Sequence, residues 1–99
     1  MSEVQVVFWR DIPAQVKARQ TGERAARALT LRFQEAIDVA AMRAGLTETD
    51  DYLGEWRSSP WEEHAGPPQE AAERRGAEIE AEYSDERLRQ LAEDGGRTT

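Results

Sequence analysis

Apolar and polar residues alternate at the start of the chain. Apolar side chains occupy every second position from Val4 to Phe8, and the alternation resumes over residues 14–19. A period of two is typical of β-strands. Asp11-Ile12-Pro13 separates the two runs with turn chemistry, because proline donates no ladder hydrogen bond. The pattern predicts an N-terminal hairpin that ends in a further turn at Gln20-Thr21-Gly22.

Two interpretations of the next segment remain open. Apolar residues recur at steps of three and four, as in one amphipathic helix over residues 22–44. Alternatively, Thr30 caps a helix that begins there, and residues 25–29 form a short third strand. Gly45 ends the helix in both interpretations, because glycine readily takes the left-handed backbone that follows a last helical turn.

Helix signals dominate the second half. Thr47-Glu48-Thr49-Asp50 fits a capping box ahead of a short helix over residues 48–57, with Tyr52, Leu53 and Trp56 on its inner face. A loop through Trp61 and His64 then leads to a surface-lying helix over residues 69–83, and Ser84 caps a last short turn.

These elements predict an α+β fold. We expect an N-terminal antiparallel β-hairpin or small three-stranded sheet packed against three to four α-helices. Residues 1–92 should form a single domain. Residues 93–99 should form a disordered tail, because this glycine-rich end has no apolar anchor.

Charge is unevenly distributed over the 99 residues, whose net charge is −7. Residues 1–44 hold seven basic side chains against five acidic ones, whereas residues 45–99 hold six against fifteen. An acidic half repels a phosphate backbone, so we expect no nucleic acid as partner. The chain has no cysteine and no apolar run of membrane-spanning length, so we expect a cytoplasmic protein without a membrane partner.

Candidate catalytic and metal-binding residues are few. The only histidine, His64, lies beside Glu62 and Glu63 in a predicted loop, where an exposed imidazole is favoured over a catalytic base. Neighbouring acids such as Asp50 and Asp51 point apart on regular elements and lack the calcium-loop frame. We therefore expect no catalytic residue, no metal and no cofactor, and no enzymatic activity.

One surface is a candidate binding site. On a regular hairpin, Trp9 shares a sheet face with Gln15, Lys17 and Arg19, and such a face suits a carboxylate, a phosphate or an acidic partner. The alternative is that Trp9 packs against a helix while Arg10 pairs with Asp11. Trp56 is assigned to the core, and Trp61 is left open between the core and an interface. The candidate binding residues are Trp9, Arg10, Asp11, Gln15, Lys17 and Trp61.

Several blocks of sequence together carry a resemblance. They are residues 8–17, 32–38, 41–42, 44–47 and 51–53, with Trp56. Over about residues 4–83 the chain resembles the small bacterial family named virulence factor. In that family the segment before the helix looks strand-like and ends in leucine and a capping residue, which favours the break at Leu29-Thr30.

The resemblance implies a mode of action. Related domains end larger repeat-containing proteins named conserved virulence factor C, which suits an interaction module whose partner is another protein, such as a larger enzyme or a repeat protein. It also suggests, as an alternative, an accessory subunit that binds a small anionic ligand in folate or corrinoid methyl transfer. A stand-alone hydrolase is the third hypothesis, and it alone needs a base and a nucleophile in a cleft.

Overall fold

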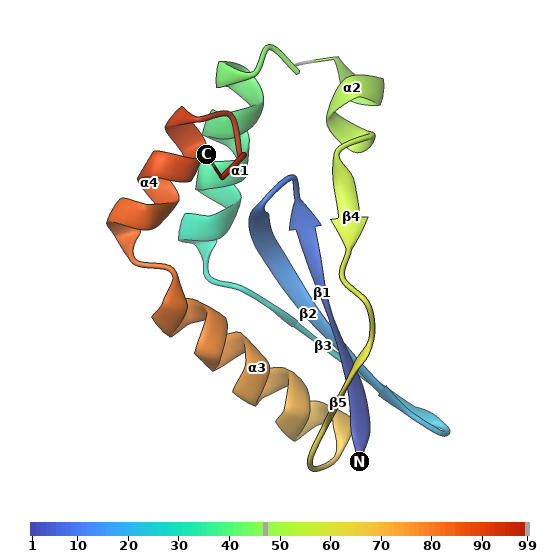
Figure 1. Ribbon diagram of the computed structural model, residues 1–99. Coiled ribbons are helices and arrows are strands. Elements are labelled where there is room, and N and C mark those ends of the chain that lie inside the picture. The colour runs from blue at the N-terminus through green and yellow to red at the C-terminus, as the bar shows by residue number, and fades with distance from the viewer. Residues whose placement is uncertain (47, 99) are drawn as a thin grey trace.

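A five-stranded antiparallel sheet and four helices make up the described part of the computed structural model, which comprises residues 1–46 and 48–98. Figure 1 shows the helices α1, α3 and α4 on one side of the central strands. The α+β prediction is confirmed. The predicted capping residue Thr47 lies outside the described residues.

The first three strands form a meander. Strands β1 (Ser2–Trp9), β2 (Ile12–Gln20) and β3 (Glu23–Ala28) pair in sequence order. The hairpin is confirmed, and β3 decides the open question in favour of a third strand. Its alanine-rich sequence has helical propensity, but pairing with β2 along the whole of β3 overrides that weak local preference.

Two short strands complete the sheet. Strands β4 (Trp56–Ser58) and β5 (Glu62–His64) both pair with β1 on the side opposite β2. The predicted helix over residues 48–57 is therefore wrong beyond its first turns, since α2 spans only Thr49–Leu53. The free side of β1 needs hydrogen-bond partners, and this segment supplies them as extended backbone.

Helices cover one face of the sheet. Helix α3 (Pro68–Glu82) crosses β1, β2 and β3, and α1 (Leu31–Arg43) packs against α4 (Asp85–Glu93) and β2. Ala72, Gly76 and Ile79 of α3 are buried, so the helix that was predicted to lie at the surface covers the sheet. The predicted cap of α4 is confirmed, because the Ser84 hydroxyl accepts a hydrogen bond from the Arg87 N–H.

A glutamate of α3 accepts hydrogen bonds from the N-cap residue of α1. Thr30 is the N-cap residue of α1, as predicted, but its side chain makes no capping bond within the helix. Instead, Glu80 accepts from the Thr30 N–H at 2.7 Å and from its hydroxyl at 2.9 Å, and pairs with Arg32 at 3.0 Å. Burial raises the pKa of Glu80, but these hydrogen bonds outweigh burial and hold the pKa below its ordinary value.

Trp9 lies in the core, contrary to the expectation that it shares an exposed face with Lys17. Strict alternation from Val6 predicts a buried Phe8 and an exposed Trp9, whereas Trp9 is 0% exposed and Phe8 is half-buried. The pairing of β1 with β2 is irregular between Val7 and Phe8 and skips Ala14. Such a bulge increases local twist and re-aims side chains, which explains why Trp9, rather than Phe8, is the fully buried side chain.

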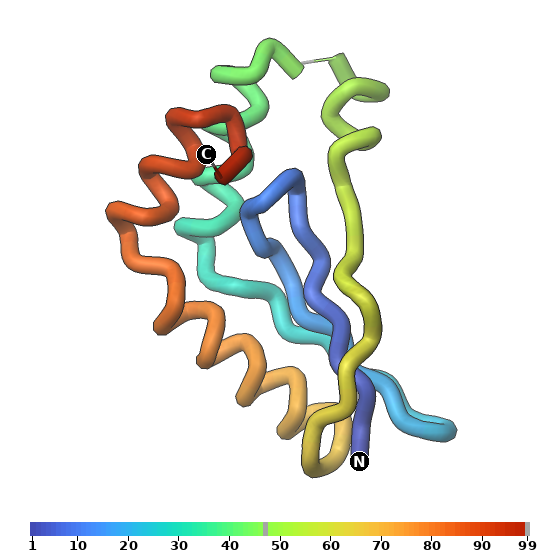
Figure 2. The backbone as a smooth tube through the Cα atoms, in the orientation of Figure 1, coloured from blue at the N-terminus to red at the C-terminus, as the bar shows by residue number. Residues whose placement is uncertain are grey.

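The chain after α4 packs against the hairpin turn, in contrast to the expected disordered tail over residues 93–99. Gly95 and Gly96 are buried, and the Asp11 N–H donates to the Gly96 carbonyl at 2.8 Å. Figure 2 traces this segment back beside α1. Thr99 lies outside the described residues. The anchor that the sequence did not reveal is the ring of Trp9, which a Cβ at Gly96 would approach to 3.0 Å.

Candidate functional site

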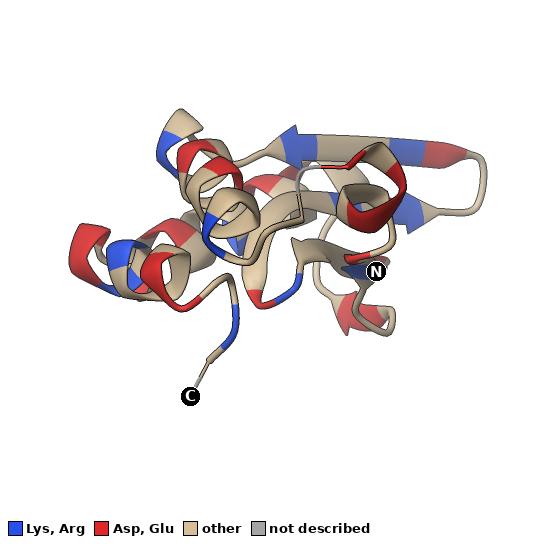
Figure 3. Ribbon diagram, turned by 90° about the horizontal axis from the view of Figure 1, so that it is seen from above, with Lys and Arg blue, Asp and Glu red and all other residues tan. Residues whose placement is uncertain are grey.

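The open face of the sheet carries a set of cations that we call the cationic sheet face. Alternation along β1, β2 and β3 places it opposite the buried residues Val4, Val16 and Ala18. Gln5 stands opposite Lys17, which stands opposite Ala26, and Arg19 stands opposite Arg24. Figure 3 shows the basic segments of β2 and β3 beside one another. The members of the cationic sheet face are Gln5, Gln15, Lys17, Arg19, Arg24 and Trp61.

The surface is hollowed at its centre. A depression of about 430 Å³ is lined by side chains or backbone of β1, β2, β3 and the segment between β4 and β5. Lys17 and Arg24 stand at this depression with Gln5 and Trp61. One hydrophobic wall beside polar and cationic groups is the arrangement expected of a site for a ligand with an anionic part.

Arg19 has its charge partner within the chain. Its Nε lies 3.1 Å from a carboxylate oxygen of Glu3, and its guanidinium carbon lies 3.9 Å from the centre of the Trp61 ring. Stacking on an aromatic face and pairing with a carboxylate together fix the guanidinium. Arg19 therefore positions Trp61 as a wall of the depression.

Lys17 and Arg24 have no such partner among residues 1–46 and 48–98. No carboxylate of the described residues lies within ion-pair distance of either side chain, whereas most arginines of this acidic chain make ion pairs. Lys17 and Arg24 are both exposed. They supply two positive charges that an anionic group can meet without displacing an existing pair.

Trp61 and Trp56 differ in their surroundings. Trp61 is half-exposed at the depression, which places it at the surface rather than in the core. Trp56 is half-buried, packs against the core cluster and contacts Tyr52 edge to face, with ring centres 6.1 Å apart. The core assignment of Trp56 is therefore confirmed in part.

Arg10 and Asp11 lie at the turn between β1 and β2 and serve its structure. Arg10 takes a left-handed backbone with φ 52°, and its guanidinium donates to the Gly95 carbonyl and to Glu55. Asp11 accepts from Arg57 and from the Thr98 N–H. Burial raises the pKa of Asp11, but these contacts outweigh it and lower the pKa. The Arg10–Asp11 pair of the alternative interpretation does not form, because Arg10 pairs with Glu55 and Asp11 pairs with Arg57.

Sequence reasoning missed Gln5 and Arg24 as members of the face. Arg24 becomes a neighbour of Arg19 only when residues 23–28 are a strand in this register with β2. Arg24-Ala25-Ala26-Arg27 does not alternate, so local periodicity gave no signal for this strand, and the break at Leu29-Thr30 was the available indication. The register depends on the turn at Gly22, whose backbone is left-handed with φ 78°.

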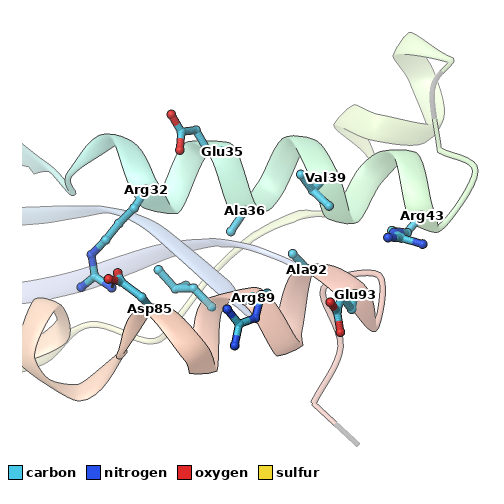
Figure 4. Close-up of a pocket in the computed structure, with 10 residues that line it drawn as sticks. Arg32, Glu35, Ala36, Val39, Arg43, Asp85, Arg89, Ala92 and Glu93 are labelled. Carbon is cyan, nitrogen blue, oxygen red and sulfur yellow. Dashed lines mark hydrogen bonds and ion pairs between the residues drawn. The ribbon is translucent and has the colours of Figure 1, made fainter.

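A groove between α1 and α4 is the main alternative site. Figure 4 shows that its charged residues come from both helices, with Arg32 beside Asp85 at one end and Arg43 with Glu93 at the other. The groove measures about 310 Å³, and its floor includes Ala36, Leu88 and Ala92. Arginines and carboxylates alternate around it, so no single charge is presented to a ligand.

A second alternative lies between the end of α1 and α2. Met42 and Leu53 are exposed there beside a largely apolar hollow, although Leu53 was predicted to face inward. Among the described residues, its lining includes one carboxylate, Asp38, and no basic side chain, so it does not match an anionic ligand.

His64 stands in β5 opposite Ser2 of β1. The Ser2 hydroxyl is buried and donates to the Gly66 carbonyl at 2.8 Å, so its proton is directed away from an imidazole. Among residues 1–46 and 48–98, no group of three or more histidine and acidic side chains is arranged to hold a metal ion. None of the helices in this part of the chain combines the length and apolar character needed to cross a bilayer.

Comparison with curated proteins and with solved structures gave no significant match. The family model described as virulence factor matches residues 7–92, which include most of the sheet, helices α1 to α3 and all but the last residue of α4. The chain therefore belongs to the virulence factor family.

Proposed function

We propose that the protein is a non-catalytic interaction module whose cationic sheet face binds an acidic segment of another protein, such as a larger enzyme or a repeat protein. The observation that carries this proposal is the pair of exposed cations, Lys17 and Arg24, beside one depression and without a carboxylate partner in the described chain. In a chain of net charge −7, unpaired cations gathered on one face favour an anionic partner.

Trp61 adds to this surface. A half-exposed tryptophan held by Arg19 offers apolar contact area at little cost in side-chain entropy, since its ring is already fixed. Aromatic rings flanked by arginine are frequent at protein interfaces. An interaction module needs no nucleophile or base, which agrees with the hydrogen bond that directs the Ser2 hydroxyl to the Gly66 carbonyl.

A second candidate is an accessory subunit that binds a small anionic ligand of a methyl-transfer system. The volume of the depression, about 430 Å³, favours this candidate because it lies within the range of small-molecule sites. Both proposed functions use Lys17 and Arg24. The identity of the bound partner, a protein or a small anion, therefore distinguishes the two functions.

The test is affinity capture from native cytosol with a matched set of variants. We expect a stoichiometric protein partner to be retained by the wild type and by Arg43→Ala, and lost from the double variant Lys17→Ala/Arg24→Ala. Arg43 is a suitable control because it is exposed and lies on α1, away from the sheet face. Equal melting temperatures establish that all three proteins are folded.

Two results would overturn the proposal. Retention of the same partner by the double variant places binding elsewhere on the surface. Native mass spectrometry that finds a small anion on the wild type but not on the double variant, with no protein partner, supports the accessory subunit instead.

A further inference from the structure

Strand β3 is an edge of the sheet, and one hydrogen bond fixes which of its backbone groups face outward. The Leu29 N–H donates to the Ala14 carbonyl of β2 at 3.1 Å. In an antiparallel pair, successive residues direct their N–H and C=O groups alternately toward the partner and away from it. In the register of β3 with β2, Ala25 and Arg27 therefore bond to β2, while Arg24, Ala26 and Ala28 face the free edge.

This edge is accessible. Arg24, Ala26 and Ala28 are all exposed, and no described residue makes a hydrogen bond to their outward backbone groups. Helix α3 crosses the opposite face, where Arg27 pairs with Glu73. The β2–β3 hairpin projects from the body of the molecule at its turn (Figure 2). Unpaired strand edges of this kind are templates for the addition of another strand.

The same three residues also carry their side chains on the cationic sheet face. Ala26 lies opposite Lys17, so only a methyl group separates the lysine from a strand added at the edge. Neighbouring strands lie about 4.8 Å apart, and an extended lysine spans more than this distance. On an added strand, a carboxylate opposite Ala26 would thus contact Lys17. A second carboxylate two residues along that strand would contact Arg24.

We propose that the edge of β3 is a strand-addition site for an extended acidic segment of a partner protein, with carboxylates at alternate positions. This inference rests on the proposed function and names its partner: backbone groups of Arg24, Ala26 and Ala28 bind the segment, and Lys17 and Arg24 select its charge. A second copy of this chain is a poorer occupant. Its own β3 carries only Arg24, Ala26 and Ala28 on that face and offers no carboxylate.

The experiment titrates the protein with a short peptide of alternating glutamate and valine. Its control is the same peptide N-methylated at each glutamate, which keeps the charges and removes the N–H groups that would face β3. We expect the N-methylated peptide to bind at least about tenfold more weakly, since several hydrogen bonds are lost. Ala26→Pro should weaken the unmodified peptide similarly, because it removes one outward N–H without touching the bonds to β2.

Amide hydrogen exchange of the wild type supplies a second measurement that needs no variant. Saturation with the unmodified peptide should slow exchange at Arg24, Ala26 and Ala28 at least about tenfold, while Ala25 and Arg27, already bonded to β2, change little.

The outcomes separate this inference from the proposed function. Equal binding of both peptides without protection, but weaker binding by Lys17→Ala/Arg24→Ala, overturns strand addition and leaves the cationic face as a docking surface. Binding that is unaffected by Lys17→Ala/Arg24→Ala, or no binding at millimolar peptide, overturns strand addition to an acidic segment. Protection of these amides from exchange that appears without peptide and rises with protein concentration identifies a second copy as the occupant of the edge. This result also overturns strand addition of an acidic segment.

Discussion

The guanidinium of Arg27 occupies the space that a side chain at Gly76 would fill. The Cδ and Cζ atoms of Arg27 lie 2.6 Å and 2.8 Å from the position of a Cβ at Gly76. Arg27 comes from the helix-facing side of β3, and its Nε also pairs with Glu73 one turn earlier on α3. The glycine therefore lets α3 lie against the sheet with an arginine between them.

Gly76→Ala should destabilise the protein, although the same change in an exposed helix interior stabilises by about 1 kcal/mol. The new methyl group overlaps the guanidinium, so Arg27 must move and its pair with Glu73 is lost. We expect a net loss of about 1–2 kcal/mol, typical of overpacking, in chemical denaturation.

A double-mutant cycle separates overlap from other causes. Once Arg27 is replaced by alanine, the overlap is gone, and Gly76→Ala should then stabilise by up to about 1 kcal/mol through helix propensity. An equal effect of Gly76→Ala in both backgrounds would show that the two residues are not coupled.

Gly96→Ala should lower the melting temperature more than Gly22→Ala. Both glycines have left-handed backbones, with φ 90° and 78°, so both changes carry conformational strain of roughly 1–2 kcal/mol. Only at Gly96 does the added Cβ approach the Trp9 ring, at 3.0 Å, whereas Gly22 has open space. Equal shifts in the two melting curves would contradict the packing of the C-terminal segment on Trp9.

Trp9→Ala should cost more stability than Phe8→Ala. Trp9 is completely buried, and its indole N–H donates to the Tyr52 carbonyl at 2.9 Å, so its loss should cost about 3–5 kcal/mol. Phe8 is half-buried beneath the guanidinium of Arg57, and its loss should cost roughly half as much. Urea denaturation of both variants tests the bulge, because a regular strand would reverse their order.

Glu80→Gln should weaken the protein near neutral pH and make its stability less sensitive to acid. The pKa of Glu80 is lowered in the folded state, so its contribution is complete above the unfolded value, about 4.3, and is lost as pH falls through the lower folded value. Wild type and Glu80→Gln should differ most above about pH 5 and converge at acid pH, once the pH has fallen through the lowered folded value.

The measurement for this prediction is the urea midpoint across that pH range. Glu78→Gln, an exposed position on the same helix, controls for the loss of one negative charge. A constant difference between wild type and Glu80→Gln at all pH values would contradict the role assigned to its carboxylate.

Local pattern alone determined much of this protein. Alternation marked β1 and β2. Gly22 marked the turn after β2, Gly45 marked the end of α1, and Ser84 marked the start of α4. These features depend on neighbours within a few residues, so the sequence contains their causes. The α+β class and the placement of Lys17 and Gln15 on one face follow from the same short-range rules.

Tertiary structure decided what depends on partners distant in sequence. Trp9 is buried because a bulge at Ala14 of β2 accompanies its turn toward Tyr52 and Gly96, and neither contact is encoded near Trp9 in the chain. Trp56 extends as a strand because β1 has a free side there, overriding the helical pattern around it. Arg24 joins Lys17 only through strand register, since a one-residue slip would move it to the other face of the sheet.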